Sequence, residues 1–259
     1  MKLFREKDVK VNGERVNKDR AVKCGDSVEV YYDGAPAPLA EPVYKDENIL
    51  IMNKPSGITS ESFYKAVASA YPGAIFTHRL DRNTSGIMMF ALNGQAYAEL
   101  YSALKNRSIE KYYYCAVYGV MDPPNGVFED YLVKDEKNSR VKIYNNKVKN
   151  ALSVKTGYRT LSAYENASVL KIRLYTGRTH QIRAHLAFYG HFVLGDGKYG
   201  DDRINRTFKV KGQVLVSGEV TFRFAKDCVL SYLDGKTFCV PYDEVYACLR
   251  NNTGENADK

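Results

Sequence analysis

The strongest constraint on the fold is the alternation of apolar and polar residues in the middle of the chain. In ASVLKIRLYTG, residues 167–177, Leu170, Ile172 and Leu174 fall on one side of an extended backbone, with lysine and arginine between them. The segment KYYYCAVYGV, residues 111–120, is rich in tyrosine and valine, which favour strands. The middle of the chain is therefore predicted to form a sheet.

The first residues have their own pattern. Residues 1–32 are predicted to form a small module, because Asn12 and Gly13 lie between valines, which is a strong hairpin signal. In the following GDSVEVYY, Val28 and Val30 alternate with polar residues, as in a half-buried strand.

Three prolines in residues 33–42 separate this module from the main domain. Because repeated prolines remove hydrogen-bond donors from the backbone, the segment is predicted to be an extended linker. The main domain is expected to span residues 43–250, and the polar residues 251–259 are expected to form a tail. Near its start, ENILIMNKPSG predicts a buried strand that enters a turn. SESFYKAVASAY then predicts a helix capped by Ser60 or Ser62.

Composition limits the classes of protein that fit. The 259 residues are 44% hydrophobic, which is enough for one large core. The net charge of +8 favours a polyanionic partner, although a merely soluble basic protein fits the charge equally well. Five scattered cysteines without a CxxC pair argue against a disulfide framework. Without a signal peptide or an apolar run of membrane length, a cytoplasmic protein with no membrane partner is expected.

One stretch carries most of the net charge. Residues 134–159 hold eight basic and two acidic residues, with two tyrosines among them. Basic residues interleaved with aromatic ones suit contact with phosphates and stacking on bases, whereas a solvated pair of strands would have the same composition. Under the first interpretation, Lys142, Lys147 and Lys149 contact backbone phosphates.

Charge is also crowded in THRLDRNTSGIMMFALNG, residues 77–94, where Asp81 lies between Arg79 and Arg82. A lone aspartate before Asn-Thr-Ser-Gly is more often a turn or cap residue than a catalyst. A cation beside a partly buried carboxylate favours its ionised form, however, and a nucleophile needs that form. Ser85 lacks the GxSxG pattern of serine hydrolases. The residues alone therefore allow either a structural turn or an anionic site.

The segment TGRTHQIRAHLAFYGHFVLGDGKYG, residues 176–200, contains a second cluster of polar residues. Thr179 is expected to cap a helix that runs to about Tyr189. All four histidines lie in this segment or in the previous one, which raises the question of a zinc site. His180 and His185 are five positions apart, so they point away from a common helix face, and no metal site is expected.

Several segments together resemble a known family. HRLDRNTSGIMMFA is similar, nearly residue for residue, to the catalytic motif of the RluA-type pseudouridine synthases. KYYYCAVYG resembles the family's next motif, TGRTHQIRAHLAFYGHFVLGDGKYG its third, and NKPSG the turn that opens its domain. These motifs occur in consistent order between Val43 and Gly200. The N-terminal DVKVNGERVNKDRAVKCGDSVEVYY resembles the later half of the small S-four-type RNA-binding domain, so a partial RNA-binding module is expected at residues 1–32.

The resemblance implies an α+β pseudouridine synthase fold, in which helices flank a curved, largely antiparallel mixed sheet. It implies an enzyme that isomerises specific uridines of structured RNA, ribosomal (rRNA) or transfer (tRNA), to pseudouridine with no metal and no organic cofactor. Chemistry on a base inside folded RNA requires the nucleotide to be flipped out. A cytoplasmic monomer with RNA as its partner is expected.

The resemblance also implies roles for individual residues. Asp81 matches the family nucleophile, Arg183 the arginine that pairs with it, and Tyr113 the tyrosine that stacks on the flipped uracil and can relay a proton. Arg79 is expected to hold the phosphate of the extruded nucleotide or to fill the hole that it leaves. Three more basic residues are expected to position backbone phosphates or, with greater weight, to buttress loops: Lys54, Arg178 and His180.

Two other functions stay open from the sequence. One is a non-catalytic RNA-binding or RNA-folding factor on the same scaffold, although an inactive copy would have no need to keep Asp81, Tyr113 and Arg183 together. The other is a histidine-based metalloenzyme, which would contain bound metal when purified.

Overall fold

The computed structural model of the chain describes residues 9–16, 20–30, 39–136, 138–210 and 212–253. The chain forms two compact units, Met1–Leu39 and Ala40–Lys259. The predicted linker, residues 33–42, and the predicted tail, residues 251–259, lie largely outside the described residues.

The N-terminal unit contains three short antiparallel strands in the order β2-β1-β3. They are β1 (Val9–Val11), β2 (Glu14–Val16) and β3 (Val28–Val30). Asn12 and Gly13 have positive φ angles of 52° and 80°, as the predicted hairpin turn requires. The prediction of a half-buried β3 is wrong, because Val28 and Val30 are 47% and 53% exposed. β3 is an edge strand, and no helix in the described part of this unit covers it.

The large unit is built on an eleven-stranded mixed sheet. The main path runs β10-β9-β11-β12-β8-β13-β7-β5-β4, while β14 pairs with β13 and β6 with β7. The strands are β4 (Tyr44–Lys45), β5 (Ile49–Lys54), β6 (Ile75–Phe76), β7 (Ser85–Ala91), β8 (Ile109–Tyr118), β9 (Asn125–Asp135), β10 (Arg140–Tyr144), β11 (Leu152–Tyr164), β12 (Ala167–Leu174), β13 (Leu215–Phe222) and β14 (Thr237–Cys239). Among these pairings only β7 with β13 is parallel, so the largely antiparallel mixed sheet expected for the fold is confirmed.

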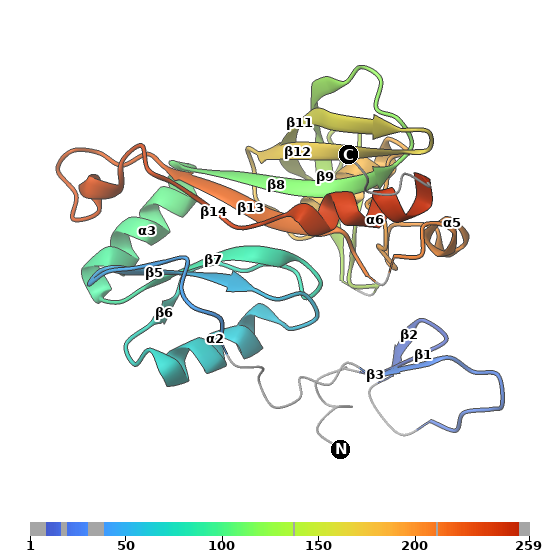
Figure 1. The fold of residues 1–259 in the computed structure, drawn as a ribbon, viewed down its shortest axis with the longest axis horizontal. Helices are drawn as coiled ribbons and strands as arrows, with labels where there is room; N and C mark the ends of the chain where they lie inside the picture. The colour runs from blue at the N-terminus through green and yellow to red at the C-terminus, as the bar shows by residue number, and fades with distance from the viewer. Residues whose placement is uncertain (1–8, 17–19, 31–38, 137, 211, 254–259) are drawn as a thin grey trace. The chain divides into compact units, whose positions relative to one another are not determined.

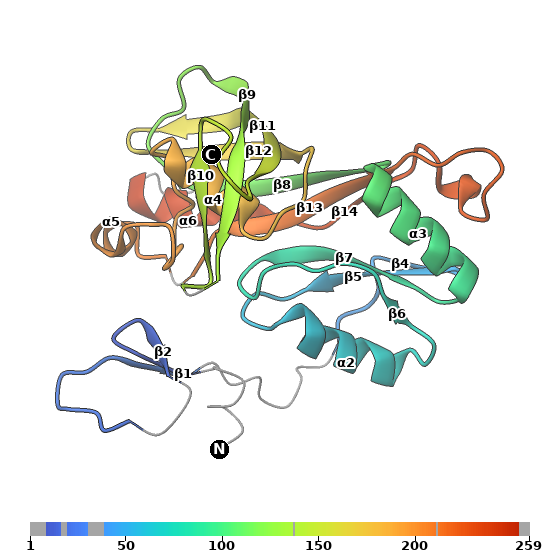
Figure 2. The ribbon, with the colours of Figure 1, turned by 180° about the vertical axis from the view of Figure 1, so that it is seen from behind.

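Helices cover both faces of this sheet. They are α2 (Ser60–Ala70), α3 (Gly94–Asn106), α4 (Gln181–Phe188), α5 (Asp202–Thr207) and α6 (Asp243–Thr253), with one 3-10 helix, η1 (Ser231–Leu233). Figure 1 shows α2 against the β5–β7 part of the sheet and α6 along β8 and β13, and Figure 2 shows α4 on the opposite side, near β10. None of the helices in the described part is both long and apolar enough to cross a membrane.

Two predicted helix starts are corrected. Thr59, rather than Ser60 or Ser62, caps α2, because its extended backbone lets its side chain accept the Ser62 N–H. In α4 the residue before the helix is His180, whose φ of 54° is left-handed, so Thr179 lies outside the helix and does not cap it. The cap of α2 is one position before Ser60 and three before Ser62, and the residue before α4 is one position after Thr179, so both predicted helices stay in place.

The parallel contact between β7 and β13 depends on a glycine. Gly86 lies opposite Ser217 and has a φ of 113°, which side chains rarely allow. A Cβ atom at this position would overlap the Ser217 backbone. The glycine of the Asn-Thr-Ser-Gly segment therefore lets the chain that follows Asp81 enter the sheet beside β13.

Candidate active site

Most of the residues that line a cleft of about 470 Å³ in the large unit come from three segments, and Leu174 and Leu215 complete its wall. Residues 76–84, between β6 and β7, form the first, and Lys111 and Tyr113 of β8 form the second. Residues 177–183, which lead into α4, form the third. Each segment belongs to a different motif of the sequence, so folding brings the three motifs to one place.

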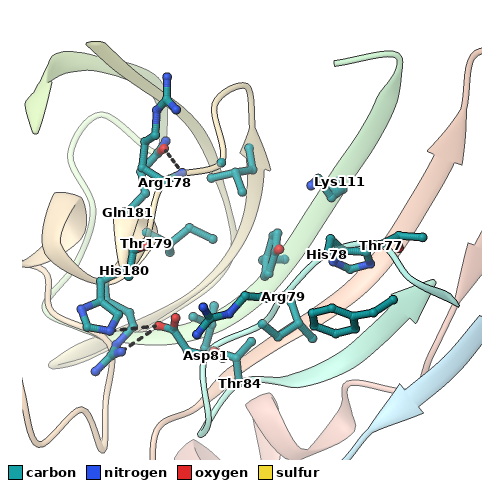
Figure 3. Close-up of a pocket in the computed structure, with 18 residues that line it drawn as sticks. Thr77, His78, Arg79, Asp81, Thr84, Lys111, Arg178, Thr179, His180 and Gln181 are labelled. Atoms are coloured by element: carbon teal, nitrogen blue, oxygen red, sulfur yellow. Dashed lines mark hydrogen bonds and ion pairs between the residues drawn. The ribbon is translucent and has the colours of Figure 1, made fainter. Parts of the chain in front are cut away.

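Figure 3 shows how the side chains are distributed around this cleft. Asp81 lies near the middle, with Thr179 and His180 on one side and His78 and Lys111 on the other. The carboxylate is therefore placed where a substrate in the cleft would meet it.

The loop that carries Asp81 is held on both sides by the start of α2 and the turn before it. Ser60 Oγ donates to Leu80 O at 2.8 Å, and the Leu80 N–H donates back to Ser60 Oγ at 2.9 Å. On the other side, the Gly57 N–H donates to Arg82 O at 3.0 Å. Since both neighbours of Asp81 are fixed, its side chain starts from a fixed backbone.

Lys54 belongs to this support and not to an RNA-binding surface. Its side chain is fully buried, and Nζ donates to the carbonyls of Pro55, Ile58 and Arg82 at 2.8–3.0 Å. An ammonium that is buried and bonded to three carbonyls has no surface to offer a phosphate. The expectation of a phosphate contact is corrected here, and the buttressing alternative fits the contacts.

Arg183 joins Asp81 to a second carboxylate. Its Nη1 donates to Asp81 Oδ2 at 2.7 Å, while Nε and Nη2 donate to the two oxygens of Asp196 at 2.6 and 2.8 Å. Burial alone would raise the pKa of Asp196, but the hydrogen bonds from Arg183 and from the backbone of Lys198 and Tyr199 bring that pKa below its usual value. Burial opposes the charge of Arg183, and the two carboxylates overcome this and raise its pKa.

Sequence reasoning missed Asp196. It lies in the GDGKYG end of the third motif, but its spacing from Arg183 gives no local signal, because the rest of α4 and a loop separate the two residues. The available clue was a carboxylate within a motif that already contained an arginine expected to form an ion pair.

His180 is the second group near Asp81, with Nε2 at 3.9 Å from Asp81 Oδ2. Burial is the main cause that lowers the pKa of His180 to about 4, so the ring is neutral at neutral pH. The Val141 N–H donates to the Tyr199 hydroxyl at 2.8 Å, and that hydroxyl lies 2.9 Å from His180 Nδ1. A neutral ring carries one proton, and Nδ1 faces the Tyr199 hydroxyl while Nε2 faces Asp81. Tyr199 was also missed from the sequence.

Tyr113 lies in the same cleft and is 7% exposed. Burial raises the pKa of Tyr113 to about 12, with the negative charge of Asp81 adding to the effect and a hydrogen bond to Ser217 opposing it. The phenol is therefore protonated at neutral pH and is able to donate a hydrogen bond into the cleft.

Arg79 and Arg178 line the rim of the cleft. Arg79 Nε is 3.1 Å from Glu61 Oε1, in an ion pair whose side chains are both more than half exposed. The Arg178 N–H donates to Gln181 Oε1 at 3.1 Å, which fixes the backbone of this exposed residue but leaves its guanidinium at the surface. Both positions suit contact with a phosphate backbone.

The three lysines of the basic stretch that were predicted to contact phosphates are not among the cleft residues. Lys142 is on β10, and Lys147 and Lys149 are on the turn that follows, with all three exposed. Lys155 from the same stretch is paired with Glu129 at 2.6 Å. Any RNA contact of these lysines is therefore outside the cleft that holds Asp81.

The remaining histidines of the two motifs have structural partners. His78 Nε2 accepts the Met89 N–H at 3.0 Å, and burial, together with the charge of Lys111, lowers the pKa of His78 to about 3. His185 is fully buried, with Nε2 at 2.9 Å from Asp130 Oδ2 and Nδ1 at 2.9 Å from Thr156 Oγ1. In the described part of the chain no three His, Cys, Asp or Glu side chains are grouped closely enough to hold a metal ion.

Comparison with known proteins identifies a family for the chain. Residues 48–188 match the family model described as RNA pseudouridylate synthase. The chain is 32% identical over 231 residues to the ribosomal large subunit pseudouridine synthase C of Vibrio cholerae, covering 79% of this chain and 72% of the relative. It is 30% identical over 245 residues to the uncharacterized RNA pseudouridine synthase YlyB of Bacillus subtilis, covering 83% and 77%.

The fold has a counterpart of known structure. The human RNA pseudouridylate synthase domain containing 1 superimposes with a TM-score of 0.70 and 25% identity, over 84% of this chain and 90% of that chain. The family model spans more than half of the present chain and includes both Asp81 and Arg183. The chain therefore belongs to the RNA pseudouridylate synthase family and is an RluA-type RNA pseudouridine synthase.

Proposed function

We propose that this enzyme isomerises uridine in rRNA or tRNA with Asp81 as its catalytic carboxylate. The observation that carries the proposal is the contact of 2.7 Å between Arg183 Nη1 and Asp81 Oδ2 inside a cleft that also contains Tyr113. The charge-assisted hydrogen bond from the guanidinium holds the carboxylate in one direction, and a nucleophilic or charge-stabilising role requires such a fixed direction.

The other cleft residues have complementary tasks in this proposal. A flipped uracil stacks on the Tyr113 ring, and the protonated hydroxyl of Tyr113 serves as a proton donor and relay. Nε2 of His180 faces Asp81 at 3.9 Å, and the ring limits the directions in which the carboxylate can turn. Arg79 and Arg178, at the rim, bind the phosphates on either side of the extruded nucleotide.

For the substrate, we propose large ribosomal RNA ahead of tRNA. The support is the 32% identity to the Vibrio cholerae enzyme, whose name states that it acts on the large ribosomal subunit. We further propose that the protein acts in the cytoplasm as a monomer, and that the N-terminal unit adds RNA contacts.

Asp81→Asn is the decisive variant, because it keeps the size of the side chain but removes the charge and the nucleophilic oxygen. The assay is tritium release from RNA transcripts labelled at uracil carbon-5, made from large ribosomal RNA and from tRNA genes. We expect turnover to fall at least about a thousandfold, while RNA affinity and melting temperature stay near those of the wild type.

The matched control is Asp227→Asn, which makes the same chemical change at an exposed position away from the cleft. Substantial turnover by Asp81→Asn would falsify the catalytic role. If the wild type binds RNA but releases no tritium from either class of transcript, the second candidate, a non-catalytic RNA-binding factor, is the correct one.

A further inference from the structure

One cation in the cleft has no task in the proposed reaction. Lys111 is on β8, two residues before Tyr113, and both side chains line the cleft. Because side chains alternate along a strand, residues two apart share a face and are about 7 Å apart. Lys111 is therefore beside the tyrosine that we propose to stack on uracil, and on the same wall.

The surroundings of Lys111 leave its ammonium available. Among the residues that the structure describes, it has no ion-pair or hydrogen-bond partner, and desolvation lowers its pKa. Thr77 and His78 lie at the same end of the cleft as Lys111 (Figure 3). The side chain of Thr77 donates to Met89 O, and His78 accepts the Met89 N–H. The ring of His78 also hydrogen-bonds the Arg79 backbone, so His78 has no free nitrogen for a ligand. Lys111 is left as the donor that can meet a substrate there.

The reaction generates a negative charge that needs such a donor. When the bond between ribose C1′ and uracil N1 breaks, the electron pair stays with uracil, and the charge is shared between N1 and the carbonyl oxygens O2 and O4. Carbon-5 then bonds to C1′, and the proton lost from carbon-5 balances the proton taken up at N1. Between these steps the base is an anion, and a cation aimed at a carbonyl oxygen stabilises it most where water is excluded.

We propose that Lys111 is a further catalytic residue, whose ammonium binds a carbonyl oxygen of the flipped uracil and stabilises the uracil anion. This rests on the proposed function, in which Asp81 acts on a flipped uridine. A backbone phosphate is the competing ligand. Arg79 and Arg178 at the rim suit phosphates, whereas the partly buried Lys111 on the wall beside Tyr113 suits the base.

The experiment compares Lys111→Met, Lys111→Gln and Lys111→Arg with a control, Lys65→Met, which removes an exposed lysine on α2 away from the cleft. The measurements are single-turnover tritium release from the labelled ribosomal transcript, filter binding across a salt series, and thermal melting. We expect Lys111→Met and Lys111→Gln to lose about 10²–10³ in single-turnover rate, as for removal of one charge-stabilising donor. Lys111→Arg should retain most of the rate because it keeps a cation.

Binding and stability separate this role from the alternatives. RNA affinity and its salt dependence should stay near wild type, and the melting temperature should not fall, since an uncompensated desolvated charge has been removed. Two results overturn the proposal. One is a near-normal rate in a folded Lys111→Gln or Lys111→Met protein, and the other is a loss of affinity with a flatter salt slope, which would assign Lys111 to a phosphate. If neither the wild type nor Lys65→Met releases tritium, the result contradicts the proposed function itself, on which the role of Lys111 depends.

Discussion

At the scale of single residues, the geometry of the site depends on how the N–H donors of Arg183 are shared between Asp81 and Asp196. Asp196 accepts from Nε and Nη2 of Arg183, so this carboxylate alone fixes the plane of the guanidinium. The remaining Nη1 then points at Asp81 Oδ2. Because Asp196 holds the guanidinium, the hydrogen bond from Arg183 to Asp81 has a fixed direction. A long arginine side chain without such a partner would leave that direction variable. We infer that Asp196 positions Arg183 and does not itself touch the substrate.

A prediction at the same scale concerns the hydroxyl of Tyr113. In Tyr113→Phe the ring still stacks, and stacking contributes about 1–3 kcal/mol per base. The proton donor is lost, so we expect turnover to fall by about 10²–10⁴, as for loss of a positioned acid or base. Filter binding and single-turnover tritium release distinguish the two effects. Normal turnover by the Phe variant would reduce Tyr113 to a stacking or core residue.

At the scale of elements, the active-site loop depends on the turn between β5 and α2. The buried ammonium of Lys54 joins carbonyls of that turn to Arg82 O, and Ser60 holds Leu80. Since these contacts fix the backbone on both sides of Asp81, the Lys-Pro-x-Gly turn contributes to the site without touching the substrate. This explains why a lysine so close to the cleft is fully buried.

The basic stretch gives a prediction for β10 and the turn after it. Replacing Lys142, Lys147 and Lys149 by glutamine should weaken binding to RNA of any sequence, because these side chains are proposed to bind phosphates and not bases. The slope of log K against log salt should flatten by about 0.7 for each single-strand phosphate that is no longer neutralised. Salt titrations by filter binding measure this slope.

The control for that experiment makes the same change in net charge at three lysines outside residues 134–159. The exposed Lys65, Lys105 and Lys226 are replaced by glutamine in a second triple variant. Equal slopes for the two variants and the wild type would show that Lys142, Lys147 and Lys149 form only a solvated face, which is the alternative that the sequence left open.

At the scale of the whole molecule, three partly or fully buried histidines make stability depend on pH. The pKa values of His78, His180 and His185 are all lowered, mainly by burial, to about 3 and about 4 for the first two. An unfolded histidine titrates near 6.5, so between these values the unfolded chain binds more protons than the folded one. The stability that these three neutral histidines contribute to the folded chain is complete above about pH 6.5 and is lost as the pH falls towards about 3.

The matching prediction is that the melting temperature falls as the pH is lowered from about 6.5 to 4, and falls less steeply in His78→Gln than in the wild type. Melting at about pH 8, where His78, His180 and His185 are neutral, gives the cost of the substitution apart from titration and serves as the reference. Parallel curves for the two proteins would show that His78 takes up its proton as readily in the folded chain as in the unfolded one.

Local patterns in the sequence specify much of the fold. β12 follows from alternation, β8 from its tyrosine and valine content, β5 from a buried apolar run, and the hairpin at Asn12 from turn chemistry, all of which act between residues a few positions apart. The same patterns failed at Val28 and Val30, because an alternating strand is half buried only when something covers it. The α+β class and the family were predicted from the resemblance of four motifs. The periodicity of apolar residues predicts single strands but not their order in a sheet.

The meeting of charged residues, by contrast, is a property of the folded chain. Asp81 and Arg183 are 102 positions apart, and their contact was expected from the resemblance and from no local pattern. The roles of Asp196, Tyr199, Lys54 and Lys111 depend on whether each side chain is buried, and by which partners, which packing between distant segments sets. The chain's local chemistry thus specified the elements and the residue types of the site, while the three-dimensional fold selected the partners, because burial and hydrogen bonding are properties of neighbours in space.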